Sequence, residues 1–170
     1  LPPGDAAIMR INRGGAEHWG VAQFHDPLRE GVVDAVRNLR KAGKEVVLVT
    51  GMEKRKAEHY AKMIDPHNPP KVFADQLETK TIAENGAHQY TPAKVQVLEQ
   101  YAKPGNVIAA VGDGLNDAAF MSAVKDKGGL SFAIASTGAG STKNVASMVI
   151  QGIHQVEEII DASKRLNQFL

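Results

Sequence analysis

The sequence contains no cysteine, and that absence removes several kinds of chemistry at once. Disulfide bonds, thiolate metal sites and a cysteine nucleophile are all excluded. The 20 lysine and arginine residues nearly cancel the 19 aspartate and glutamate residues, so a net charge of +1 favours neither nucleic acid nor an anionic membrane surface as the main partner. Long apolar runs are also absent, since the stretch 107–111 is far shorter than the roughly 20 residues that span a bilayer. We expect membrane contact only through segments outside this chain.

What the chain does contain is enough sequence for one compact domain, at 170 residues. It begins with Leu1, Pro2 and Pro3 and has no basic and apolar leader, so we interpret it as an excised or processed piece without a signal peptide. We accordingly expect a cytoplasmic location, either for a free protein or for the cytosolic domain of a membrane protein.

Short runs rich in valine, isoleucine and phenylalanine alternate with stretches that repeat apolar residues at helical spacing. That alternation predicts an α/β fold with a doubly wound, mostly parallel sheet and helices on both faces. The predicted strands are 20–24, 45–50, 71–74, 107–112, 130–135 and 147–150. A first helix is predicted from Val32 to a stop at Gly43, and the others are 56–64, 92–102, 115–124 and 153–169. We assign residues 20–170 to the core and residues 1–19, with one apolar run at 6–11, to an N-terminal arm or strand.

The segment with the most chemistry is 107–124, a buried strand followed by a turn and a helix. Gly112 and Gly114 let the backbone turn tightly, while Asp113 and Asp117, four residues apart, bring two carboxylates to one site. Two converging carboxylates suit Mg2+, which takes one or two carboxylates plus phosphate and water. Asn116 adds a neutral polar group nearby. Such residues are also common in turns and helix caps, but their place directly after a strand favours the metal site.

Two further features point to phosphate chemistry. Thr50 and Gly51 follow a strand at the carboxyl edge of the sheet, where a hydroxyl and backbone amides can hold a phosphoryl oxygen. Lys94 enters the first turn of a helix after Pro92, and its ammonium group can neutralise a phosphoryl group and a carboxylate. Each has an ordinary alternative, which is a turn for Thr50 and Gly51 and a solvated helix lysine for Lys94.

In this order, the features resemble the haloacid dehalogenase superfamily, and more closely the phosphorylation domain of P-type ATPases. The stretch DPLREGVVDAVRNLRKAGKEVVLVTG resembles the family's segment from its Asp-Pro-x-Arg motif to its Thr-Gly-Asp strand. TPAK resembles the Pro-x-x-Lys motif, and GDGLNDAAFMSAV resembles the Gly-Asp-Gly-x-Asn-Asp signature. SFAIASTGAGSTKNVASMVI resembles the strand, glycine-rich turn and strand that come next. The resemblance covers about residues 20–170.

The resemblance implies roles for the carboxylates and the lysine. Asp113 would bind Mg2+, with Asp117 and Asn116 supporting the ion and the phosphate oxygens. Lys94 would stabilise a phosphorylated aspartate and its transition state.

The resemblance also implies contacts at the other strand and at the start of the first helix. Thr50 and Gly51 would hold the phosphoryl group. Asp26 and Arg29 would lie near a hinge and help to organise the nucleotide. An ion pair at a helix N-terminus accounts for Asp26 and Arg29 equally well.

Two positions depart from the family pattern. The family's nucleophile lies in the string Asp-Lys-Thr-Gly-Thr, which occurs nowhere in this chain. Met52 replaces the aspartate of Thr-Gly-Asp, which removes a carboxylate from the nucleotide side. Either the chain begins after the nucleophile strand, or the protein is a relative that lost phosphorylation. We favour the first interpretation.

In this fold the nucleophile strand would lie between the strand that ends at Thr50 and the strand before Asp113. Without it, two strands would expose unpaired backbone groups in the middle of the sheet, which is costly unless another segment fills the space. Either a separate segment completes the sheet or residues 6–11 do. In the second case Asp5 would lie at the wrong end of the strand for catalysis.

We expect the function of the C-terminal part of a P-type ATPase-like phosphorylation domain. The reaction would be Mg2+-dependent ATP hydrolysis through an aspartyl phosphate, coupled to cation transport. The expected partners are ATP or a phosphorylated small molecule and the missing N-terminal part of the same domain. A soluble haloacid dehalogenase-type phosphatase and a binding or regulatory domain without a nucleophile are the alternatives, and the sequence leaves open whether the chain is active alone.

The glycine-rich stretch 136–144 lacks the spacing of a nucleotide-binding P-loop and predicts a turn into a helix.

Overall fold

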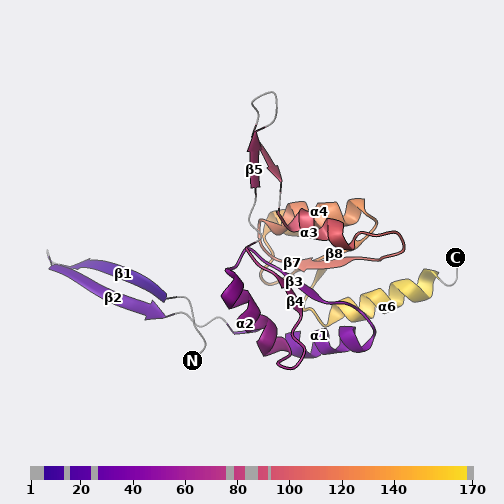
Figure 1. Ribbon diagram of the computed structural model, residues 1–170, viewed down its shortest axis with the longest axis horizontal. Helices are drawn as coiled ribbons and strands as arrows, with labels where there is room; N and C mark the ends of the chain where they lie inside the picture. Colours follow the sequence, from indigo (N-terminus) through magenta and orange to yellow (C-terminus); the bar gives the residue numbers. More distant parts are fainter. Residues whose placement is uncertain are drawn as a thin grey trace.

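The computed structural model describes residues 6–13, 16–23, 27–75, 79–82, 88–91 and 93–167, and the side chains of 27–75 and 93–162. Its parallel strands are β3 (Val47–Val49), β4 (Lys71–Phe73), β7 (Ala109–Gly112), β8 (Leu130–Ile134) and β9 (Met148–Ile150). The helices are α1 (Val32–Lys41), α2 (Lys54–Ile64), α3 (Ala93–Tyr101), α4 (Asp117–Asp126), α5 (Gly140–Val145) and α6 (Gln155–Asn167). Helices lie on both sides of the strands (Figure 1), so the predicted α/β fold is confirmed.

Two apolar clusters lie on opposite faces of the sheet formed by β7, β8 and β9. On one face the sheet packs against α6 through Phe132, Ile134, Ile150 and Val156. On the other face it packs against α3 and α4 through Leu98, Ala110 and Val124. The alternation of side chains along a strand explains the two clusters, because neighbouring residues point to opposite faces.

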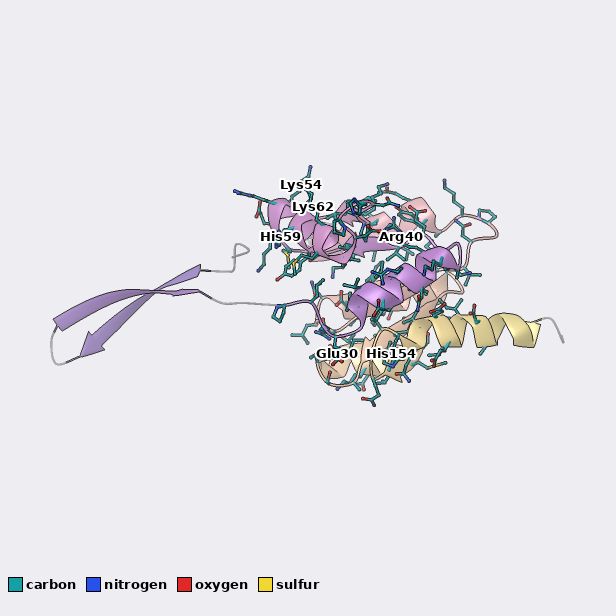
Figure 2. All side chains as sticks on the ribbon, turned by 90° about the horizontal axis from the view of Figure 1, so that it is seen from below. Glu30, Arg40, Lys54, His59, Lys62 and His154 are labelled. Carbon is teal, nitrogen blue, oxygen red and sulfur yellow. The ribbon has the colours of Figure 1, made fainter. Side chains whose placement is uncertain are left out.

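Helix α1 packs against both α2 and α6 and lies between them (Figure 2). Its buried residues, Ala35, Val36 and Leu39, recur at helical spacing. Gly43 follows the helix with a φ of 74°, a left-handed conformation that glycine adopts without a side-chain clash. The predicted stop at Gly43 is therefore confirmed.

The strands are divided into two separate groups. β3 and β4 form one parallel pair, and β7, β8 and β9 form a parallel sheet in that order. β3 lies between β4 and β7 (Figure 1), yet among the described strands none pairs with the facing edges of β3 and β7. The expected opening in the middle of the sheet is present. Val111 on β7 is 37% exposed.

The N-terminal part forms a hairpin of its own. β1 (Ala6–Arg13) and β2 (Ala16–Gln23) pair antiparallel along their whole length and lie apart from the other strands (Figure 1). The alternative in which residues 6–11 fill the opening is therefore wrong, since β1 and β2 form a two-stranded sheet that neither β3 nor β7 joins. The strand predicted at 20–24 begins earlier, at Ala16, and residue 24 lies outside the described part.

A second hairpin was not predicted from the sequence. β5 (Thr79–Ile82) and β6 (His88–Thr91) pair antiparallel between β4 and α3 (Figure 1). Their mostly polar sequences lack the apolar pattern by which the other strands were found.

Candidate functional site

The loop after β7 folds around the side chain of Asp117, the first residue of α4. Asp117 Oδ2 accepts hydrogen bonds from the backbone N–H of Asp113 at 3.1 Å and of Gly114 at 2.9 Å. A Cβ atom on Gly112 would lie only 2.7 Å from Asp117 Cγ, so the loop needs glycine at that position. The GDGLND string is thus a turn closed by its last carboxylate.

Lys94 approaches the same carboxylate from α3. Its Nζ lies 2.5 Å from Asp117 Oδ1, and the two side chains are only 10% and 12% exposed. Lys94 is therefore not a solvated helix lysine. Because the backbone holds Oδ2 and Lys94 holds Oδ1, both oxygens of Asp117 are already engaged, and its predicted role at the metal stays a prediction.

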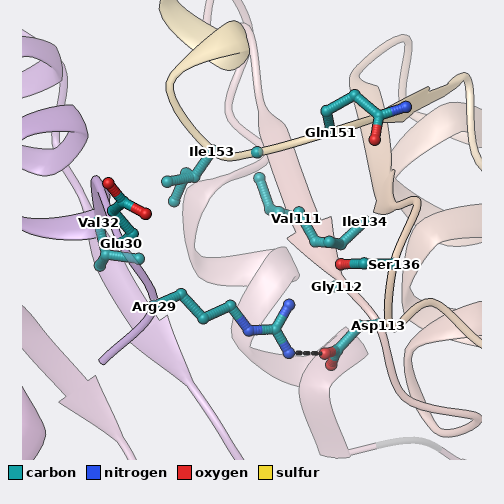
Figure 3. Close-up of a pocket in the computed structure, with 11 residues that line it drawn as sticks. Arg29, Glu30, Val32, Val111, Gly112, Asp113, Ile134, Ser136, Gln151 and Ile153 are labelled. Atoms are coloured by element: carbon teal, nitrogen blue, oxygen red, sulfur yellow. Dashed lines mark hydrogen bonds and ion pairs between the residues drawn. The ribbon is translucent and has the colours of Figure 1, made fainter. Parts of the chain in front are cut away.

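Asp113 lies at the mouth of the loop and is more open, with its side chain 38% exposed. Its Oδ2 accepts hydrogen bonds from Arg29 Nη2 and from Thr137 Oγ1, the latter at 3.0 Å. Arg29 Nη1 also donates to Thr137 Oγ1 at 2.7 Å. Figure 3 shows the Arg29 side chain reaching across to Asp113. The structure thus brings Arg29, which the family resemblance places near a hinge, to the predicted metal ligand.

The loop between β8 and α5 is the part of the site that sequence reasoning missed. Besides the contact from Thr137, Ala139 N–H donates to the carbonyl oxygen of Asp113 at 2.8 Å. From α5, which follows the loop, Thr142 Oγ1 donates to the carbonyl oxygen of Gly114 at 2.6 Å. The predicted turn into a helix at 136–144 is confirmed, since α5 begins at Gly140. The sequence did offer one signal for this loop, because the Thr137 hydroxyl follows a predicted strand at the same sheet edge as Asp113.

Thr50 and Gly51 lie at the carboxyl end of β3, on the other side of the opening. Thr50 Oγ1 accepts a hydrogen bond from Met52 N–H at 3.1 Å, which leaves its own proton to donate. Among the described contacts, none joins Thr50 or Gly51 to Asp113 or Lys94, so their phosphoryl role stays a prediction. Asn116 is exposed and its side chain does not cap α4.

Asp26 lies outside the described residues, and its predicted role is untested.

A cavity of about 500 Å3 adjoins the Arg29 and Asp113 pair. Its apolar walls come from α1, β7, β8 and the turn before α6, through Val32, Val111, Ile134 and Ile153 (Figure 3). The cavity therefore lies beside β7 and the Asp113 turn.

The donor set at Asp113 fits Mg2+ with one protein carboxylate. In the described ranges, no group of three histidine, aspartate or glutamate side chains could hold a metal ion by itself. Mg2+ does not need such a cage, because it usually keeps several waters and takes the rest of its ligands from one or two carboxylates and from phosphate. Asp113 Oδ1, which no described group contacts by a hydrogen bond, is the oxygen available to it.

A family model of haloacid dehalogenase-like hydrolases matches residues 3–125. The chain therefore belongs to the haloacid dehalogenase-like hydrolase family. The Asp113 turn and Lys94 are both within the matched residues.

The chain is also similar to curated P-type ATPases. It is 26% identical over 148 residues to a chloroplastic copper-transporting ATPase of Arabidopsis thaliana, covering 87% of this chain and 14% of that protein. It is 28% identical over 155 residues to a silver exporting P-type ATPase of Salmonella typhimurium, covering 88% and 17%. It is 25% identical over 142 residues to the mouse (Mus musculus) calcium-transporting ATPase type 2C member 1, covering 77% and 15%. The resemblance to P-type ATPases is confirmed, and the chain spans only 14 to 17% of these relatives' lengths.

A solved structure supports the fold. The cobalt-bound deoxy-D-mannose-octulosonate 8-phosphate phosphatase of Haemophilus influenzae superposes with a TM-score of 0.51 at 16% identity, over 76% of this chain and 64% of that one. This similarity confirms the fold class. Among the described residues, no helix combines the length and the apolar composition needed to cross a membrane.

Proposed function

We propose that the chain supplies the magnesium and lysine half of a P-type ATPase-like phosphorylation site. The reaction would be Mg2+-dependent ATP hydrolysis through an aspartyl phosphate, coupled to cation transport and carried out on the cytoplasmic side. The observation that carries the proposal is the buried pair of Lys94 and Asp117 directly behind the open carboxylate of Asp113. The similarity to the copper, silver and calcium ATPases supports the same function.

The chain's own residues have distinct tasks in this proposal. Lys94 has three N–H donors and donates one of them to Asp117, so the other two can bind phosphoryl oxygens. Asp117 holds the ammonium group in place, which avoids a cost of reorientation when charge develops on the phosphoryl group. Thr50 offers its hydroxyl proton from the opposite side of the opening. Asp113 Oδ1 would hold Mg2+, which when bound neutralises phosphoryl charge.

The nucleophile would come from a segment outside this chain, the missing N-terminal part of the same domain. Among the described strands, the facing edges of β3 and β7 have no partner, so they offer backbone donors and acceptors to an extended segment placed between them. A parallel strand in that position would end at the same sheet edge as Thr50 and Asp113. Its last residues would therefore reach the phosphoryl site.

The test is phosphoenzyme formation by the full-length natural protein, which on this proposal includes the nucleophile segment. The protein is incubated with radiolabelled ATP and Mg2+, quenched in acid and assayed for protein-bound phosphate. We expect label in the wild type and its loss in Asp113→Asn and Lys94→Ala.

Lys127→Ala is the matched control for this test. Lys127 pairs with Glu99 beyond the C-terminal end of α4, whereas the site lies at the N-terminal end of that helix. We expect normal labelling of this variant. Absence of label from the wild type, or full labelling of Asp113→Asn, would refute the proposed function.

A further inference from the structure

The loop after β8 contacts the Asp113 turn directly and is part of the site. The loop is tied to the Asp113 turn through the Thr137 hydroxyl and the Ala139 N–H, and α5, into which it leads, adds the Thr142 hydroxyl. Thr142 is fully buried, so its bond to the Gly114 carbonyl is shielded from water. The two loops therefore form one unit.

The backbone of this loop has little freedom around Thr137. Gly138 N–H donates to the carbonyl oxygen of Ile134 at 2.7 Å, and a Cβ at Gly138 would lie 2.5 Å from that oxygen. Lys143 Nζ donates to the carbonyl oxygen of Ala135 at 2.6 Å. The backbone on both sides of Thr137 is thus held by contacts within the chain.

The Thr137 hydroxyl uses both of its hydrogen-bonding functions at the site. It donates its one proton to Asp113 Oδ2 and accepts a proton from Arg29 Nη1. Oδ2 consequently receives two donors, Thr137 and Arg29, while Oδ1 receives none among the described groups. The carboxylate is oriented with one oxygen held and one oxygen free.

We infer that Thr137 is a positioning residue, whose hydroxyl fixes the Asp113 carboxylate so that Oδ1 is presented to Mg2+. This inference rests on the proposed function, because it takes Asp113 as the metal ligand. Hydrogen-bond partners of metal-ligating carboxylates typically change metal affinity by about 10- to 100-fold when they are removed. Because Thr137 is exposed, we expect an effect at the lower end of that range.

The experiment is a calorimetric titration of the protein with Mg2+ alone, at a temperature where all variants are folded. Thr137→Val removes the hydroxyl and keeps the shape, and we expect about tenfold weaker binding. Thr137→Ser restores the hydroxyl, and we expect binding within about twofold of the wild type. Ser141→Ala removes an exposed hydroxyl from the same segment and should leave the affinity unchanged.

Asp113→Asn separates failure of this inference from failure of the proposed function. If Asp113→Asn abolishes binding and Thr137→Val binds as the wild type does, Thr137 has no positioning role and the metal site stands. If Thr137→Ser binds as weakly as Thr137→Val, the loop's packing rather than the hydroxyl matters, and the inference is overturned. If the wild type does not bind Mg2+, or Asp113→Asn binds it equally well, the proposed function fails as well.

Discussion

Replacing Lys94 by methionine tests how the buried ion pair contributes to the fold. Methionine keeps the length and apolar stem of lysine but removes the charge, so the carboxylate of Asp117 stays buried without its cation. Removing one partner of a buried pair typically costs about 3 to 5 kcal/mol. Asp117 Oδ2 retains two backbone N–H donors, so we expect the lower value, about 3 kcal/mol. For a chain of this size that corresponds to a fall of roughly 6 to 12 °C in the midpoint of thermal unfolding.

The assay is urea unfolding of the wild type, Lys94→Met, Asp117→Asn and the double variant. Because the two side chains are in contact, their effects should not add, and the double variant should be more stable than the sum of the single losses predicts. Lys127→Met is the matched control, since Lys127 and Glu99 form an exposed pair, at 35% and 58% exposed, worth less than about 1 kcal/mol. A loss below about 1 kcal/mol for Lys94→Met, or strict additivity in the cycle, would refute a buried, coupled pair.

Two further substitutions test the surroundings of Asp113. Arg29→Ala removes a half-exposed cation whose charge repels Mg2+ at the same carboxylate, so calorimetry should show Mg2+ binding up to about fivefold tighter. Arg37→Ala breaks an exposed pair on α1 and should not change the affinity, and weaker binding in Arg29→Ala would contradict the repulsion. Gly138→Ala places a Cβ 2.5 Å from the Ile134 carbonyl oxygen and should lower the free energy of unfolding in urea by about 1 to 3 kcal/mol. Gly140→Ala, where a Cβ meets open space, should leave that free energy unchanged. Equal stability of the two variants would show that the loop is not constrained as described.

Much of the fold could be predicted from local sequence patterns. Apolar runs such as 130–135 and 45–50 indicated the parallel strands because buried strands need continuous apolar residues. Gly43 marked the end of α1 because its left-handed backbone suits glycine. The opening beside β7 followed from the absence of one motif together with the backbone pairing that a sheet requires.

The parts that could not be predicted depend on contacts between distant segments. The hairpin of β5 and β6 is polar, so its pairing leaves no apolar signature. Asp117 and Lys94 were both singled out, but only the fold shows that they engage one another, across 23 residues of sequence. Thr137 looked like part of an ordinary turn, because its contacts with Asp113 and Arg29 join residues 24 and 108 positions away.

The most direct test of the central claim is a Mg2+ titration followed by backbone amide NMR. If Asp113 holds the ion, the amide signals of Asp113, Gly114 and Thr137 should shift together with one affinity. The amides of Asp113 and Gly114 donate to Asp117 Oδ2 within the same turn, and the Thr137 hydroxyl donates to the Asp113 carboxylate, so all three belong to one hydrogen-bond network. Signals from α2, which takes no part in that hydrogen-bond network, should stay in place, and Asp113→Asn should remove the shifts. Shifts of equal size in Asp113→Asn, or no change at these three amides in the wild type, would contradict the assignment of this turn as the magnesium site.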